Sequence, residues 1–350
     1  MKQAIYERTK KEADDSTVEW LLQSEDPSIQ YLTLTDILNM PKDSSEVEET
    51  LRRVPVGPRV RVLLDGQESD GGFGVHPYQK WTGAHWRLVS LIELGVSQRF
   101  RPAVRATDLV LKWLLGDAHV RNVPRINGLY RRCASQEGNA LAVCSRLGLT
   151  KDPRVRRLAE SLIEWQWPDG GWNCDRREKA HHSSFNESLS TLWGLAEYFQ
   201  ATGDERVEGS VERAAEFFLR HRLFRSCKTD EPRQPETLHG KVRRSIHSVT
   251  DLHYPLYWHY DILQALTILH RVGKLGDPRT SDAIDLVESK RGEDGRWNPE
   301  GYYWNLKRKT RAKLAVSNVD TVNWGRNGPN EFITLNALRV LKAAGRFGAN

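Results

Sequence analysis

Four acidic residues, each near the start of an apolar helical segment, are the strongest candidates for chemistry in this sequence. They are Glu137, Glu187, Asp261 and Glu331. Carboxyl groups gathered at one cavity raise one another's pKa, so that one of them can serve as a proton donor. Such an acid suits general acid chemistry on an alkene, an epoxide or a leaving group. Acids also favour helix N-termini as caps and for electrostatic reasons, so capping is the simpler explanation of each position.

Basic and aromatic residues accompany these acids. Glu187 and Asp261 are the preferred acids, with Glu137 and Glu331 in support. Three histidines are candidates to position or move protons: His85, His182 and His259. Three arginines are candidates to hold an anionic group: Arg87, Arg131 and Arg132. Four aromatic residues offer ring faces that can stabilise a cation: Trp81, Trp86, Trp258 and Tyr260.

A zinc site is a weaker alternative. Cysteine, histidine and aspartate are zinc ligands, and the candidates are Cys174, Asp175 and His182, with Cys133, His181 and His253 on neighbouring loops. None of them has the spacing of a metal-binding motif, and a cysteine or histidine near a core is usually there for packing. The sequence therefore predicts no cofactor, with zinc as the one exception to test.

Two kinds of helical segment alternate along the chain and would position these residues. Five segments are apolar over most of their circumference and end at a glycine: 81–95, 136–148, 185–203, 259–273 and 331–345. Four carry a single apolar stripe beside charged residues: 102–115, 153–166, 207–220 and 281–290. A helix that is apolar on most sides is buried, whereas one with a single stripe lies outside. The alternation predicts an all-α fold in which five to six helical hairpins form a double-ring α/α barrel, with an open superhelix as the alternative.

Three Asp-Gly turns, each followed closely by an aromatic residue, recur along this pattern. They lie at Gln67–Phe73, Gln166–Trp172 and Asp294–Trp297. Glycine supplies the positive φ of such a turn, and the ring can pack back on the preceding helix. Three copies in one chain indicate a repeated structural unit.

The first two turns resemble the "QW" repeats of squalene and hopene cyclases, and the third resembles a degenerate copy. The resemblance covers roughly residues 60–345 and extends to protein prenyltransferase β subunits, which share the fold. It implies an α/α toroid similar to short bacterial squalene-cyclase-like proteins. It also implies acid-initiated cyclisation, isomerisation or transfer of an apolar, isoprenoid-type substrate in a central aromatic cavity.

The catalytic motifs of those families are missing from this sequence. It has neither the D-x-D-D acid of squalene-type cyclases nor a D-D-x-x-D magnesium motif. Cys174 and Asp175 reverse the order of the prenyltransferase zinc segment, and Glu187 takes the place of the zinc histidine. Because one fold hosts several chemistries, two alternatives remain. One is a hydrolase or lyase that uses paired carboxylates on a polar substrate, and the other is a non-catalytic binding protein.

Composition and hydrophobic pattern indicate the class of protein, its domains and its relation to membranes. A chain of 350 residues with 39% hydrophobic and 28% charged residues is typical of a globular protein. We expect an N-terminal helical extension over 1–64 and a toroid domain over 65–350. Without an apolar run of 18 residues or a signal-peptide core, the expectation is a cytoplasmic protein with no membrane span, although peripheral membrane contact stays open.

The net charge of +6 is concentrated in residues 225–244 and 307–313. These segments are either solvated loops or a rim that attracts an anion such as a diphosphate. No zinc-finger or RNP-type motif favours nucleic acid, so the expected partner is a small, apolar molecule. The sequence leaves the oligomeric state open.

Overall fold

The computed structural model describes residues 14–121, 123–226, 248–305 and 320–348, and these are predominantly helical. The all-α prediction is therefore confirmed. The basic segments 225–244 and 307–313 fall almost entirely outside the described residues. Within the described residues, no helix combines the length and apolarity needed to cross a bilayer.

Five buried helices follow one another as spatial neighbours. They are α5 (Ala84–Glu93), α8 (Ser135–Arg146), α10 (Phe185–Thr202), α12 (Ile262–Arg271) and α14 (Glu331–Ala343). Helix α5 packs on α8, α8 on α10, α10 on α12, and α12 on α14. Each is followed by a glycine with positive φ, the conformation that ends helices without a steric cost: Gly95, Gly148, Gly203, Gly273 and Gly345. The five predicted apolar segments are thus confirmed as helices.

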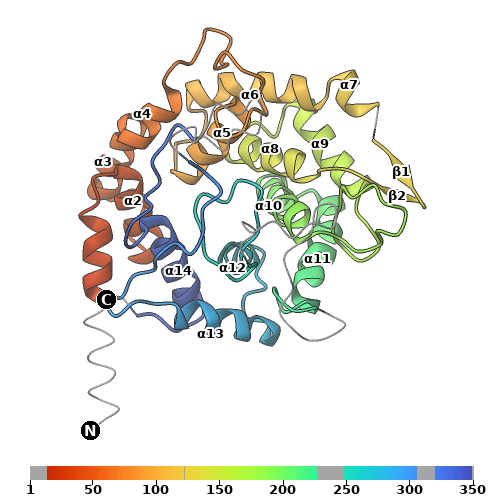
Figure 1. Cartoon of the computed structure of the whole chain (residues 1–350). Coiled ribbons are helices and arrows are strands. Elements are labelled where there is room, and N and C mark those ends of the chain that lie inside the picture. The colour runs from red at the N-terminus through yellow and green to blue at the C-terminus, as the bar shows by residue number, and fades with distance from the viewer. Residues whose placement is uncertain (1–13, 122, 227–247, 306–319, 349–350) are drawn as a thin grey trace.

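Four amphipathic helices cover the buried ones from outside. They are α6 (Arg101–Leu114), α9 (Pro153–Glu164), α11 (Glu205–Arg220) and α13 (Ser281–Ser289), the last preceded by the 3₁₀ turn η3 (Pro278–Thr280). They pack on α5, α8, α10 and α12, respectively, and lie at the periphery of the view in Figure 1. Each buries one stripe, such as Val155, Leu158 and Leu162 on α9. This is the arrangement that single-stripe helices require.

Helices α8 and α10 meet at two glycines. A Cβ atom on Gly138 would lie 2.5 Å from the carbonyl oxygen of Ser190, and one on Gly194 would lie 2.2 Å from the carbonyl oxygen of Gly138. Only residues without a side chain permit such an approach of two backbones. The crossing brings the first turns of α8 and α10, and the loops before them, close together.

The N-terminal segment is also helical. Residues 14–22 form a helix, followed by α2 (Pro27–Leu32), the π-helical turn η1 (Thr33–Ile37), α3 (Ser45–Arg53), the 3₁₀ turn η2 (Val54–Val56) and α4 (Pro58–Leu64). Pro55 lies in η2 and Pro58 begins α4, so the two prolines separate α3 from α4. Ile29 and Leu63 belong to the same hydrophobic core as the buried helices. Helix α2 packs on α14, and α4 packs on α5.

The three Asp-Gly turns share their geometry. Gly71, Gly170 and Gly295 have φ of 91°, 100° and 80°. In each turn the carbonyl group of that glycine accepts a hydrogen bond from a long polar side chain that precedes it: Gln67, Gln166 or Arg291. The common geometry supports the prediction of a repeated unit.

The aromatic residues of the last two turns link an outer helix to the next buried helix. The indole N–H of Trp172 donates to the carbonyl of Leu162 on α9 at 2.9 Å, and that of Trp297 donates to Val287 on α13 at 2.7 Å. The backbone carbonyl of Trp172 then accepts from the N–H of Ser184, the residue that caps α10. Asn330, which caps α14, donates to Trp297 in the same way. Each turn therefore sets where a buried helix begins.

A few small elements were not predicted. They are the short helix α7 (Asp117–Val120) and the antiparallel pair of strands β1 (Arg125–Ile126) and β2 (Leu129–Tyr130). They follow α6 and precede α8 along the chain, lie on the right-hand side of Figure 1, and lead the chain to Arg131, Arg132 and Cys133 just before α8.

Candidate functional site

Two cysteines and a glutamate from three separate segments meet at the N-terminal ends of α8 and α10. Cys133 precedes α8, Cys174 follows the second Asp-Gly turn, and Glu187 lies in the first turn of α10. The two sulfur atoms and a carboxylate oxygen lie within 4.8 Å of one another. Glu187 is buried and both cysteines are half-buried. Thiolate and carboxylate groups are zinc ligands, so these three residues are the ones that could hold a metal ion.

Hydrogen bonds hold this group together. The thiol of Cys174 donates to Oε1 of Glu187 at 3.5 Å, and the backbone N–H of Ser135 donates to Oε2 at 3.0 Å. The hydrogen bond with Cys133, burial and the nearby Glu187 carboxylate together hold the pKa of the Cys174 thiol above its usual range. In the absence of a cation, Cys174 is therefore protonated at neutral pH.

Glu137, in the first turn of α8, lies beside this group. Its Oε1 accepts from Nη2 of Arg132 at 2.5 Å and lies 3.1 Å from Nε2 of His119. Its Oε2 has no hydrogen-bond partner within the part of the chain that the structure describes. Burial raises the pKa of Glu137 to about 7 against the opposing effect of Arg132, and Glu187 adds to the rise. A carboxyl group with this pKa is present in both protonation states near neutral pH.

An aromatic wall adjoins these residues. Tyr78 lies with its ring centroid 5.4 Å from those of Trp86 and Trp113, and Trp113 lies 5.1 Å from His119. Burial raises the pKa of Tyr78 to about 12, with Cys133 and Glu187 among the contributing neighbours. Of these rings, only Trp86 was a candidate from sequence. Tyr78, Trp113 and His119 lack a motif, and their proximity to Glu137 follows from the packing of α5, α6 and α7.

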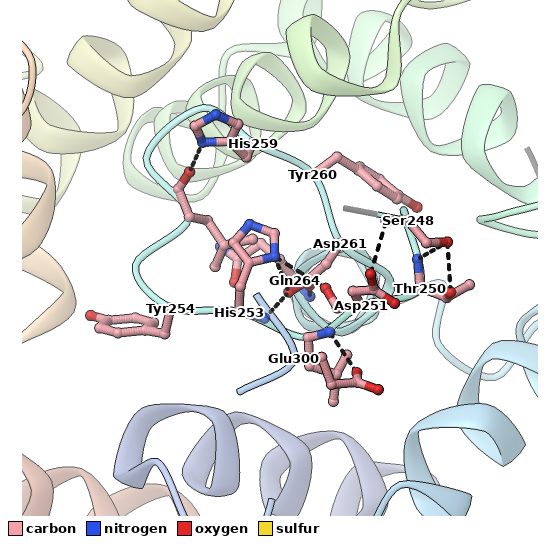
Figure 2. Close-up of polar contacts among 12 residues, drawn as sticks. Ser248, Thr250, Asp251, His253, Tyr254, His259, Tyr260, Asp261, Gln264 and Glu300 are labelled. Carbon is pink, nitrogen blue, oxygen red and sulfur yellow. Dashed lines mark hydrogen bonds and ion pairs between the residues drawn. The ribbon is translucent and has the colours of Figure 1, made fainter. Parts of the chain in front are cut away.

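The other two predicted acids have separate partners. Asp261 caps α12, where its Oδ1 accepts from the N–H of Gln264 at 2.8 Å and its Oδ2 from the N–H of His253 at 3.1 Å (Figure 2). Burial raises its pKa to about 7. Glu331 pairs through Oε2 with Arg59 of α4 at 2.6 Å. Capping accounts for the position of Asp261, and a link to the N-terminal segment accounts for that of Glu331.

The three predicted histidines lie in different surroundings. His85 is buried between α5, α6 and α8, beside Thr107 and Val110, and burial lowers its pKa to about 3. His182 is exposed and packs on His181, with ring centroids 4.0 Å apart. His259 stacks on Tyr303 at 3.4 Å and on Trp258 at 4.0 Å. Instead, His119 is the histidine that reaches one of the candidate acids of α8 and α10.

Of the three predicted arginines, Arg132 contacts Glu137. Arg87 donates to backbone carbonyls at the end of α4, including that of Leu63 at 2.8 Å, and lies 4.0 Å from the ring centroid of Phe73. Arg131 donates to the carbonyl of Ala180 at 2.9 Å and packs over Trp167. Arg87 and Arg131 thus connect segments of the chain.

The predicted aromatic residues gather around the loop 248–261. Trp81 stacks on Tyr257 of this loop with centroids 4.1 Å apart, and Tyr260 donates through its hydroxyl to the carbonyl of Leu223 at 2.6 Å. Trp258 packs on its neighbour His259, which Figure 2 shows at one end of the loop.

This loop, which precedes α12, touches four of the five buried helices. Tyr254 stacks on Phe332 of α14 and donates to Glu93 of α5 at 3.3 Å. The amide of Asn139 on α8 donates to the carbonyl of Tyr257 at 3.2 Å. The N–H of Tyr260 donates to Asn186 on α10 at 2.8 Å. The loop therefore lies between these helices.

The metal candidates from sequence separate in the structure. Cys174 lies next to Cys133 and Glu187, whereas Asp175 pairs with Arg177 and His182 is exposed. The zinc candidates from sequence included Asp175 and His182, which follow Cys174 along the chain, and Cys133 on a neighbouring loop. The neighbours of Cys174 come from other segments because α8 and α10 cross at two glycines.

A comparison with protein-family models and with curated proteins gave no match.

Proposed function

We propose that this protein is an enzyme that protonates an apolar, isoprenoid-type substrate and thereby cyclises or isomerises it. The reaction centre is the acid–thiol cluster, formed by Cys133, Glu137, Cys174 and Glu187. The observation that carries the proposal is Glu137, a buried carboxyl group with one oxygen held by Arg132 and the other unpartnered within the described residues. We propose that this oxygen delivers the proton.

Glu137 is the proton donor in the proposed reaction. The carboxyl proton adds to one carbon of an alkene, and the positive charge appears on the neighbouring carbon. The carboxylate that remains is stabilised by Arg132 at 2.5 Å. The ring faces of Tyr78, Trp86 and Trp113 stabilise the cation. The Glu137 carboxylate then takes a proton back from a carbon next to the cation, which forms the product double bond and restores the acid. This step follows the protonation directly in an isomerisation, or follows attack by a second double bond in a cyclisation.

We infer that the helices form an α/α toroid. Contacts run from α5 through α8, α10 and α12 to α14, and α2 to α4 connect α14 back to α5. This closed order of contacts supports a toroid over an open superhelix, in which the first and last helices would lie apart.

Turnover in D₂O tests the proton donor. The purified protein is incubated with squalene, farnesyl diphosphate and geranylgeranyl diphosphate, and products are analysed by mass spectrometry. Since the carboxyl proton of Glu137 exchanges with solvent, we expect deuterium in the product at the protonated carbon. Glu137→Gln is expected to lower the rate roughly 100- to 10,000-fold, the usual contribution of a general acid.

Glu208→Gln is the matched control, because Glu208 also lies in the first turn of a helix, α11, but is exposed. It is expected to keep the wild-type rate. A product without deuterium, or equal rates for Glu137→Gln and wild type, would contradict the assignment of Glu137. If sugars or simple anions alone raise the melting temperature, the substrate class is wrong.

A binding protein without catalysis is the second candidate, and the loop 248–261 favours it. Its buried residues Tyr254 and Tyr257 occupy space between the helices. Saturable isoprenoid binding without product, unchanged in Glu137→Gln, would support this candidate over the enzyme.

A further inference from the structure

We infer that Cys133, Cys174 and Glu187 bind a divalent, thiophilic metal ion of the zinc class and leave its fourth coordination position open. This inference goes beyond the proposed function, since it rests on the arrangement of ligand atoms and not on the identity of a substrate. Two sulfur ligands exclude the hard cations Mg²⁺ and Ca²⁺, which prefer oxygen.

The spacing of the ligand atoms fits a tetrahedral site. Zn–S and Zn–O bonds of roughly 2.0–2.3 Å place the ligand atoms of a tetrahedron roughly 3.3–3.8 Å apart. Sγ of Cys174 lies 3.5 Å from Oε1 of Glu187, and all three ligand atoms lie within 4.8 Å of one another. Small side-chain rotations are sufficient to bring them around one ion.

The orientation of Glu187 is fixed from outside the site. The backbone N–H of Ser135 donates to Oε2 at 3.0 Å, whereas Oε1 accepts from the Cys174 thiol. Ser135 lies two residues after Cys133, and the same backbone segment therefore holds one ligand and orients another. Outer hydrogen bonds of this kind are typical of metal sites, where they position the ligating atom.

Binding exchanges protons for the metal. Each thiol loses its proton and forms a metal–thiolate bond, so one divalent ion releases two protons and replaces the hydrogen bonds that Cys174 makes with Cys133 and Glu187. Three protein ligands leave one position for water or a substrate atom, which is the pattern of catalytic and not structural zinc sites.

Cobalt substitution tests the site. The full-length protein is treated with a chelator under reducing conditions and titrated with Co²⁺, which gives a thiolate charge-transfer band and intense visible bands when it is tetrahedral. We expect saturation at one equivalent per chain and displacement by Zn²⁺. Cys133→Ser and Cys174→Ser are each expected to weaken binding more than 100-fold, and Glu187→Gln to weaken it roughly 10- to 100-fold. Circular dichroism checks that the variants fold.

Cys144→Ala is the matched control, because Cys144 is buried in the core away from the three ligands. It is expected to bind Co²⁺ as wild type does. Absence of the charge-transfer band, or an unchanged band in Cys133→Ser, would overturn the inference, as would preferential formation of a disulfide between Cys133 and Cys174 in the presence of Zn²⁺. Glu137→Gln is expected to keep the cobalt spectrum. The turnover assay therefore tests the role of Glu137 as proton donor, and the cobalt titration tests the metal site independently of it.

Discussion

Burial decides which carboxyl groups of this protein hold a proton near neutral pH. Asp261 and Asp152 have the same local role, since each caps a helix by accepting a hydrogen bond from a backbone N–H group. Asp261 caps the buried helix α12, and Asp152 caps the outer helix α9. Burial raises the pKa of Asp261 to about 7, whereas hydrogen bonds from Arg154 hold the pKa of Asp152 below its usual range. Two aspartates with the same capping role therefore have pKa values shifted in opposite directions.

Asp261→Asn is expected to flatten the pH dependence of stability. The folded state binds a proton at Asp261 up to about pH 7, whereas an unfolded Asp releases it near about pH 4. This contribution to stability is therefore present at low pH and is lost as the pH rises through 7, by at most about 4 kcal/mol. Asn still caps helices well, and His253 and Glu300 remain as neighbours. Urea unfolding at pH 5 to 8 measures the slope, and the variant should gain stability relative to wild type as the pH rises.

Asp152→Asn serves as the control for this experiment. Asp152 is ionised in both the folded and the unfolded state over pH 5 to 8, because its pKa lies below the usual value. The variant should therefore keep the wild-type slope. Equal slopes for wild type and Asp261→Asn would show that Asp261 is ionised in the folded protein at pH 5.

At the scale of elements, two of the Asp-Gly turns join an outer helix to the next buried one: α9 to α10, and α13 to α14. Gly170 has a φ of 100°, and a Cβ atom there would lie 2.2 Å from the carbonyl oxygen of Arg213 on α11. The turn thus packs directly on the backbone of the following outer helix. Because Trp172 also positions Ser184, the start of α10 and with it Glu187 depends on this turn.

Gly170→Ala is expected to destabilise the protein by about 3 kcal/mol or more, because it adds a clash with backbone to an unfavourable φ. Gly203→Ala is the control. Gly203 also has positive φ, 66°, but a Cβ atom there meets no atom within 4 Å, so the expected cost is roughly 1–2 kcal/mol. Denaturant midpoints compare the two variants. Similar losses for both would mean that the turn can move away from α11.

At the scale of the whole molecule, charged contacts connect the N-terminal segment to the last buried helix. Arg59 of α4 pairs with Glu331 of α14 at 2.6 Å and with Asp26 at 3.1 Å. Arg339 of α14 pairs with Asp36 of η1. The segment over residues 14–64 therefore packs on helices at both ends of the series α5 to α14 and shares their core.

Arg59→Ala is expected to destabilise the protein by roughly 2–3 kcal/mol, because it leaves two partly buried carboxylates without their partner. Combined with Glu331→Ala in a double-mutant cycle, it should show a coupling of roughly 1–2 kcal/mol. Arg53→Ala, an exposed arginine of α3, should have little effect. Additive losses in the cycle would mean that the ion pair does not form in solution, and the role of Glu331 in the first turn of α14 would need another explanation.

The sequence by itself determined where the main helices form and whether each is buried on most sides or along a single stripe. Hydrophobic periodicity and the helix-ending effect of glycine act over a few residues, so the ends of α5 at Gly95 and of α10 at Gly203 were predicted from local sequence. The Asp-Gly turns were predicted as a repeated unit from equally local chemistry.

Only the tertiary structure decided which polar residues meet. A hydrophobic pattern shows which face of a helix is buried, but not which residue lies opposite that face. Cys133, Cys174 and Glu187 come together because α8 and α10 cross at Gly138 and Gly194. Asp261 and Glu331 also lie at the starts of buried helices, but they acquire other partners. Such contacts between distant segments depend on crossing geometry and burial, which are properties of the packed molecule and not of any short stretch of its chain.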